Sequence, residues 1–343
     1  MAMTHWYFVL APLVVLAVMS LLRFKGCGFH PSQEDGYGTA VGDDSPVAWF
    51  RLQDAPGSTV AKNAVGTEDG AYGTAPSPLS AGPPTWHSPA VPATSLTLGI
   101  NDPDLVPLEH EDPYDFSIRV EGAFAKVPAD VPALQDLTEF TLEALVYPDW
   151  DVTALGSYYC VLELAGMVPP ALLKSSGFGL YAGPSDTQNP NTPYSWQAWM
   201  GVGNGFQRLE EKKPYTPNDP NNPNPGPTVS KDQATYLAFT FSQSQGQAFL
   251  YLYSNDRDLD YVAYELNPVA YVPVVAGSVS QGLHIGITAQ GPLFTPPPPG
   301  VQIPLLYPFL GQMCNVAIYN QVLTQDTLRH HATIAFFVDS PGS

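Results

Sequence analysis

Short apolar runs recur along most of the chain, and clusters of Gly, Pro, Asn and Asp separate them. In residues 140–147 the even-numbered positions are apolar, which is the period-two spacing of a strand with one face against a core. Residues 248–253 are apolar on both faces, as is typical of a strand inside a sandwich. The only helix signal is 324–331, which Thr324 can cap. Many strands and almost no helix predict an all-β fold, an antiparallel β-sandwich. The predicted strands are 47–52, 140–147, 158–164, 179–182, 195–202, 236–241, 248–253, 261–266, 283–288 and 311–319.

Two proline-rich stretches, 214–227 and 292–308, interrupt this series. Proline lacks the N–H that a sheet ladder needs, so both stretches are predicted loops. They are too long for tight turns, and loops of this length often carry function or are ordered by a partner. The alternative is that they are solvated surface loops.

The N-terminal segment differs from the rest, because residues 6–22 form a run of 17 residues without a charge. This length is at the short end for a transmembrane helix. Trp6 and Tyr7 at one end suit the membrane interface, and Arg23 and Lys25 follow at the other end. The segment predicts a single N-terminal transmembrane helix within 1–25. A Gly-, Asp- and Ser-rich linker at 26–45 then leads into the sandwich.

Two alternatives fit this segment less well. A cleaved signal peptide would begin with positive side chains and end at an A-x-A-like site, and neither feature is present. A lipoprotein would need small residues before Cys27, where Phe24, Lys25 and Gly26 stand. The two cations after the span favour the cytoplasm for the bulk of the chain, whereas its acidic composition favours the other side. We expect a single-pass membrane protein with its sandwich on the periplasmic side.

The composition narrows the choice of function. The chain has 13 Lys and Arg against 32 Asp and Glu, a net charge of −19, which opposes binding to a nucleic-acid backbone. The 37 prolines exclude a helical bundle, and 44% hydrophobic residues are enough for a sizeable core. Of the three cysteines, Cys160 and Cys314 form either a disulfide or two buried free thiols, and their spacing suits no zinc site.

The carboxylates of the chain are candidates for catalytic groups and for calcium ligands. Glu139 and Glu143 lie four apart on one predicted strand, roughly 13 Å from each other, which is wider than either glycosidase geometry. We therefore expect no catalytic residues and no enzyme activity. A loop of hard oxygen ligands is a calcium candidate without EF-hand spacing, and a solvated acidic loop is the alternative. The calcium candidates are Asp102, Asp104, Glu109 and Asp112, with Glu111 and Asp115 beside them.

Three aromatic residues are candidates for binding a sugar ring by stacking. Tyr194, Trp196 and Trp199 lie between loops rich in Pro and Asn. Trp196 and Trp199 are an odd number of residues apart, so they face opposite sides of a strand and one of them belongs to the core.

The order of several segments resembles that of a known family. The segments are 47–52 followed by 57–63, then 139–146, then 236–241 with 247–253, and finally 309–323, which reads FLGQMCNVAIYNQVL. They resemble the laminin-G-like branch of the concanavalin A-like lectin/glucanase superfamily over about 46–331, with a tail at 332–343. The closing strand of that branch carries an Asp where Cys314 stands, and its central strand carries a Trp where Leu145 stands. The resemblance implies a jelly-roll of two antiparallel sheets in an extracytoplasmic setting, and it implies no single activity.

Together these features predict a non-catalytic accessory subunit. Its transmembrane helix would dock against integral membrane protein subunits in the bilayer, and its sandwich would pack on their periplasmic surface. The layout is similar to that of an accessory subunit of some bacterial reaction-centre–antenna complexes, which are photosynthetic. The alternative is a membrane-anchored carbohydrate-binding, lectin-like or adhesion module.

Overall fold

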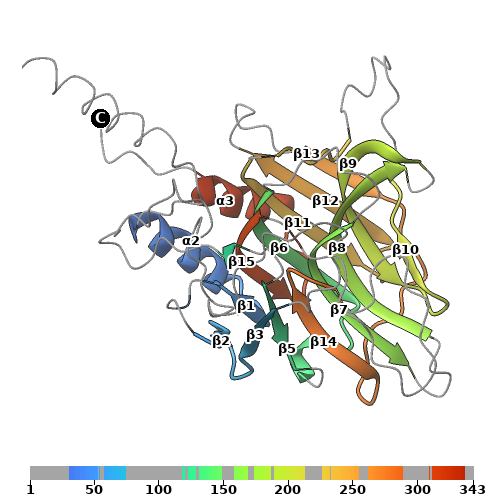
Figure 1. Ribbon diagram of the computed structural model, residues 1–343, viewed down its shortest axis with the longest axis horizontal. Coiled ribbons are helices and arrows are strands. Elements are labelled where there is room, and N and C mark those ends of the chain that lie inside the picture. Colours follow the sequence, from blue (N-terminus) through green and yellow to red (C-terminus); the bar gives the residue numbers. More distant parts are fainter. Residues whose placement is uncertain are drawn as a thin grey trace, which may run out of the picture.

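Two antiparallel sheets stacked face to face make up most of the molecule (Figure 1). The computed structural model describes residues 31–52, 54, 58–74, 118–119, 123–128, 131–148, 158–168, 174–186, 189–212, 226–231, 233–254, 262–288, 309 and 311–336. Two helices, α2 (Pro31–Asp43) and α3 (Gln325–Phe336), lie together beside the sheets, and a 3-10 turn spans Pro132–Leu134.

The first sheet consists of β1 (Ala48–Phe50), β4 (Ile118–Arg119), β6 (Glu139–Pro148), β11 (Thr235–Ser242), β12 (Gln247–Ser254), β13 (Val262–Leu266) and β15 (Gly311–Tyr319). Its strand order is β1-β15-β6-β11-β12-β13, and β4 also pairs with β15. The second sheet consists of β2 (Val60–Ala61), β3 (Gly70–Thr74), β5 (Ala123–Val127), β7 (Tyr159–Val168), β8 (Lys174–Asp186), β9 (Asn189–Gly201), β10 (Phe206–Arg208) and β14 (Val279–Ile285). Its order is β10-β9-β8-β7-β14-β5-β3-β2.

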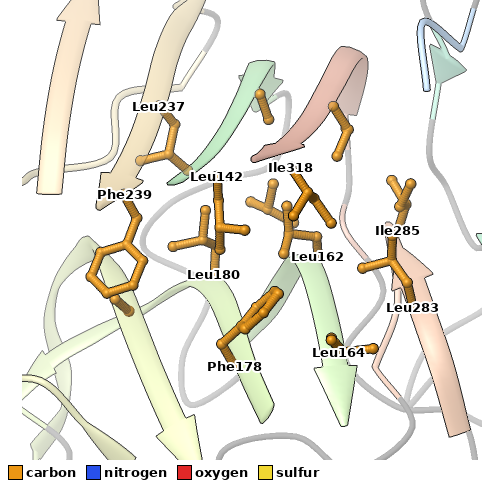
Figure 2. Packing of buried hydrophobic residues seen from close by; sticks show 14 of the residues in the cluster. Leu142, Leu162, Leu164, Phe178, Leu180, Leu237, Phe239, Leu283, Ile285 and Ile318 are labelled. Atoms are coloured by element: carbon orange, nitrogen blue, oxygen red, sulfur yellow. The ribbon is translucent and has the colours of Figure 1, made fainter. Parts of the chain in front are cut away.

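Strand β6 shows how the apolar spacing produces the core. The even-numbered residues from Phe140 to Val146 point between the sheets, and Glu143 and Leu145 point to the outer face. Across the gap, side chains of β7, β8 and β14 face those of β6, β11 and β15 (Figure 2). The rings of Phe140 and Phe178 stack with their centroids 4.7 Å apart. Each fully buried leucine or phenylalanine of this layer contributes roughly 1.5–3 kcal/mol to folding.

The antiparallel β-sandwich predicted from the apolar pattern is confirmed. Each predicted strand overlaps an observed one. The strands that the pattern missed are β2, β3, β4, β5 and β10, which have only two to five residues. A run this short hardly shows a period.

The predicted membrane anchor, residues 6–22 with Trp6, Tyr7, Arg23 and Lys25 at its ends, lies outside the described residues. Among the helices that the structure does describe, none has the length and apolar character needed to cross a bilayer. Residues 31–43, inside the stretch interpreted as a linker, form α2. At the other end of the chain, α3 runs to Phe336, five residues beyond the predicted helical turn.

The two helices cover the outer face of the first sheet. Tyr37 and Val41 of α2 and Leu328 of α3 pack there with outward-facing residues of β6, β11, β12 and β15. Leu145 and Cys314, the two departures from the laminin-G-like motifs, are cross-strand partners beneath these helices. Both positions are therefore apolar in this chain because a helical layer buries them.

Cys160 and Cys314 are free, buried thiols. They belong to separate clusters on the outer faces of the two different sheets, so of the two alternatives the structure shows free thiols and no disulfide. Burial raises the pKa of the Cys160 thiol, and the nearby Glu163 carboxylate raises it further.

Candidate functional site

A cavity of about 500 Å³ lies at one edge of the sandwich, where β9 and β10 face β12 and β13. In Figure 1, β10 lies at the right of the view, on the opposite side from α2. The volume is in the range of sites for small molecules. The lining residues used below are Tyr194, Trp196 and Ala198 of β9, Arg208 of β10, Glu210, Glu211, Gly226, Pro227, Leu250 of β12 and Leu266 of β13.

The inner wall of the cavity is aromatic, because every second residue of β9 points between the sheets. Tyr194 and Trp196 are 2% and 1% exposed. The ring of Tyr194 lies 5.8 Å from that of Tyr159, centroid to centroid. Among the described residues, the indole Nε1 of Trp196 is a buried donor without a hydrogen-bond partner. A buried donor left without an acceptor costs about 1–3 kcal/mol, which a ligand that supplies the acceptor would restore.

An ion pair stands at the rim of the cavity. Arg208 donates from Nε to Oε1 of Glu210 at 2.9 Å and from Nη2 to Oε2 at 2.7 Å. Its Nη1 donates to the carbonyl oxygen of Ser185 at 2.7 Å. The Arg208 side chain is 17% exposed and that of Glu210 is 60% exposed. All three nitrogens of Arg208 are thus engaged within the protein, and its charge is matched by Glu210.

Glu211 is the remaining charged group of the lining. It is half-buried, and its carboxylate has no hydrogen bond or ion pair to any residue that the structure describes. Burial raises the pKa of Glu211, the Arg208 charge lowers it and the Glu210 charge raises it, with a net rise. A Cβ built on Gly226 would come within 3.6 Å of Glu211 Oε1, so the carboxylate lies against this glycine.

Backbone hydrogen bonds hold the far side of the cavity to β9. The N–H of Trp196 donates to Pro227 O at 2.7 Å, and that of Val229 donates to Tyr194 O at 3.0 Å. The Tyr264 hydroxyl donates to Gly226 O at 2.8 Å, which ties this segment to β13. Residues 226–227 are the last two of the predicted loop 214–227, and the rest of that loop lies outside the described residues, as does all of 292–308.

The structure separates the three predicted sugar-binding residues. Tyr194 and Trp196 line the cavity, whereas Trp199 lies on the opposite face of β9. There Trp199 packs edge-on against Tyr158 at 5.8 Å and donates from Nε1 to Gln197 Oε1 at 2.9 Å. Trp199 is itself only 5% exposed, so none of the three offers an exposed ring to solvent. Sequence reasoning missed Arg208, which ends a strand too short to be recognised, and Glu210 and Glu211, which follow that strand.

The calcium candidates Asp102, Asp104, Glu109 and Asp112 lie outside the described residues. Within the described ranges, no group of three or more His, Cys, Asp or Glu residues is placed to hold a metal ion.

Glu139 and Glu143, the two carboxylates of β6, do not line the cavity. Glu143 is 0% exposed on the outer face of β6. It accepts hydrogen bonds from the hydroxyls of Tyr236 at 2.5 Å and Tyr319 at 2.6 Å. Glu139 instead accepts a hydrogen bond from a backbone N–H in the turn after β11. The two carboxylates therefore lie in different surroundings, with Glu143 buried beneath the helices and Glu139 bound to a turn.

A histidine of α3 links Glu143 to the end of α2. His331 Nδ1 lies 3.0 Å from Glu143 Oε2, and Nε2 lies 2.9 Å from Asp44 Oδ2. Burial lowers the pKa of His331, but the Glu143 and Asp44 carboxylates outweigh it and the net change is a rise. Burial and the Glu143 carboxylate raise the pKa of Tyr236 and of Tyr319, so both hydroxyls remain donors. This network joins both helices to the first sheet.

No family model and no curated protein matches the chain. Among solved structures, it is similar to the Trypanosoma rangeli sialidase in complex with sialic acid, at 14% identity and a TM-score of 0.41 over 84% of this chain and 33% of that chain. It is also similar to the CBM40 of Ruminococcus gnavus IT-sialidase bound to α2,3-sialyllactose, at 12% identity and a TM-score of 0.34 over 56% and 81% of the two chains. The chain thus spans about a third of the sialidase's length. Similarity of this degree assigns neither a ligand nor an activity, and it lends no support to a photosynthetic complex.

Proposed function

We propose that the sandwich is a non-catalytic binding module that takes a saccharide-sized, hydroxyl-rich ligand in the cavity between β9, β10, β12 and β13. The observation that carries the proposal is that the lining residues include both a hydrogen-bond donor and an acceptor without partners in the described part of the chain. The cavity has a buried donor in Trp196 Nε1 and an acceptor in the half-buried Glu211 carboxylate, and neither has a partner among the described residues.

A hydroxyl group both donates and accepts, so a polyhydroxylated ligand can satisfy the donor and the acceptor together. The apolar faces of a sugar ring can pack on Tyr194 and Trp196, which supply large contact area at little cost in conformational entropy. The proposed kinship with the laminin-G-like branch of the concanavalin A-like superfamily, a jelly-roll, fits such a role, and the order of the sequence motifs supports it.

A pair of tryptophan variants tests the site. In the full-length chain, Trp196→Phe keeps an aromatic ring and removes the Nε1 donor, which is unpartnered among the described residues, together with one ring of the indole. We expect it to weaken binding of a saccharide by about tenfold, the effect of one hydrogen bond of about 1.4 kcal/mol. The ligand is found first on a glycan array that includes neutral, aminated and sialylated glycans, and affinities are then measured by calorimetry.

Trp199→Phe is the matched control, because it makes the same chemical change on the other face of β9. We expect it to leave the affinity unchanged, although it removes the hydrogen bond to Gln197. Equal weakening by both variants would contradict a site in the cavity. An array without any bound glycan would contradict the proposed function.

A second role is favoured by the uncharged run at 6–22, which precedes α2. We propose that this run anchors the chain in a membrane, where it docks against integral membrane subunits and holds the sandwich on the periplasmic side. Deleting residues 1–25 is expected to move the protein from the membrane to the soluble fraction and to abolish its co-purification with partners in mild detergent. A mature N-terminus at or beyond Cys27, found by N-terminal sequencing, would argue against the anchor.

A further inference from the structure

We infer that the cavity selects its ligand by charge and favours a saccharide bearing a protonated amino group over neutral and carboxylated ones. The inference rests on the proposed function, since it concerns the same cavity, and it adds the class of ligand. It follows from how the three charged residues of the lining are paired.

Of these charges, only that of Glu211 has no direct hydrogen bond or ion pair to a residue that the structure describes. Arg208 and Glu210 form a two-point ion pair, so their charges offset each other at the rim. Lys212, the next cation along the chain, is held 2.6 Å from Glu265 Oε1 and does not line the cavity. The lining therefore carries one net negative charge on a half-buried carboxylate.

The cost of burying this carboxylate is the physical reason for the selectivity. Burial penalises the charged form of Glu211, and the charge of Arg208 offsets this penalty only in part, since the net change in the pKa of Glu211 is a rise. An ammonium group on the ligand would supply a charge-assisted hydrogen bond, which is about twice as strong as a neutral one. A neutral hydroxyl can donate to Glu211 but leaves the charge penalty in place.

The acidic composition of the chain adds to this preference. The net charge of −19 on the chain attracts cations over longer distances as well.

A carboxylated saccharide meets the opposite situation. It would approach the Glu211 carboxylate, and Arg208 is the only cation among the lining residues that the structure describes. Nε, Nη1 and Nη2 of Arg208 already donate to Glu210 and Ser185, so a second carboxylate would find only the remaining N–H groups of a guanidinium whose charge Glu210 already matches. The geometry thus disfavours anionic glycans such as sialyllactose.

The test compares matched ligands on the full-length chain. Calorimetry is performed with glucosamine oligosaccharides, with their N-acetylated counterparts of equal length and with sialyllactose, at a pH where the amine is protonated. We expect the aminated oligosaccharide to bind about tenfold more tightly than the N-acetylated one, a difference of about 1.4 kcal/mol. Sialyllactose is expected to bind most weakly.

Two variants assign the preference to one residue. Glu211→Gln keeps the shape of the side chain and removes its charge, and we expect it to bind both neutral and aminated oligosaccharides with the wild-type affinity for the neutral one. Glu265→Gln removes a charge outside the cavity, and we expect it to keep the tenfold preference.

The outcomes separate this inference from the proposed function. Equal binding of aminated and acetylated ligands, tighter binding of sialyllactose, or a preference that survives Glu211→Gln would overturn the charge selectivity and leave saccharide binding intact. If no member of the panel binds, the proposed function fails and the charge selectivity with it.

Discussion

Replacing Glu143 by glutamine is expected to lower the free energy of unfolding by about 3–5 kcal/mol, the usual cost of breaking a buried ion pair by removing one partner. The amide has nearly the shape of the carboxylate, so packing is preserved. The amide oxygen still accepts from one of the Tyr236 and Tyr319 hydroxyls, which now lie 2.5 and 2.6 Å from the carboxylate, but the NH₂ group cannot accept from the other, which loses its acceptor. The imidazolium of His331 keeps only Asp44 as its counter-charge.

The urea midpoint of unfolding measures this loss of stability. Two further variants assign the loss to particular interactions of Glu143. Tyr319→Phe removes one donor and leaves the charge of Glu143, so it should cost only about 1 kcal/mol. Combining Glu143→Gln with His331→Gln should cost less than the sum of the two single changes, because the two groups contact each other. A Glu143→Gln protein within 1 kcal/mol of wild type would show that the network does not stabilise the fold.

The sandwich was predictable because its strands carry their pattern locally. Residues 140–147 alternate, and in the structure the same even-numbered residues of β6 meet β7, β8 and β14. A pattern of period two says which face is buried but not what covers the other face. The outward-facing Glu143 therefore gave no sign in the sequence that two helices would enclose it.

Helix α2 was missed for a physical reason. Its sequence, PSQEDGYGTAVGD, holds three glycines, and each costs about 1 kcal/mol relative to alanine in a helix interior. Tertiary contacts override this weak propensity, since Tyr37 and Val41, four residues apart, both face the first sheet and are buried. A contact with strands some hundred to three hundred residues further along the chain leaves no local signal.

The cavity was predictable in part. Aromatic residue types singled out Tyr194 and Trp196, but also Trp199, which faces away from the cavity. Arg208 and Glu211 reach the site because β10 pairs with β9 and residue 211 forms a bridge with Leu266. These pairings are decided by the register of three strands, which periodicity alone does not specify.

The pairing of His331 with two carboxylates makes the stability of the fold depend on pH on the alkaline side. In the unfolded state the pKa of histidine is about 6.5. In the folded protein the Glu143 and Asp44 carboxylates raise the pKa of His331 despite its burial. The folded state thus holds the proton more tightly. The resulting stabilisation is complete below the unfolded pKa and is lost as pH rises through the folded pKa, by about 1.4 kcal/mol for each unit of difference.

A second buried histidine, His284, should lower the free energy of unfolding on the acid side. Burial, with the Lys126 charge, lowers the pKa of His284 to about 4, so the folded protein holds it neutral. The contribution of His284 to the free energy of unfolding is complete above the pKa of the unfolded state and falls as pH decreases toward 4. We therefore expect the unfolding free energy of the wild type to decline from a maximum near neutral pH in both directions, with His331 responsible for the alkaline part.

His331→Gln isolates the alkaline decline in the unfolding free energy, because glutamine keeps a polar side chain at this position and does not titrate. Urea unfolding measured at intervals from pH 6 to pH 9 should show the difference between wild type and variant shrinking as pH rises. Asp44→Asn, which removes the more exposed of the two carboxylates, should shift the same decline to lower pH because His331 then loses one of its counter-charges. A difference between wild type and His331→Gln that stays constant over this range would mean that His331 is neutral in the folded protein, and that Glu143 is held by its tyrosines alone.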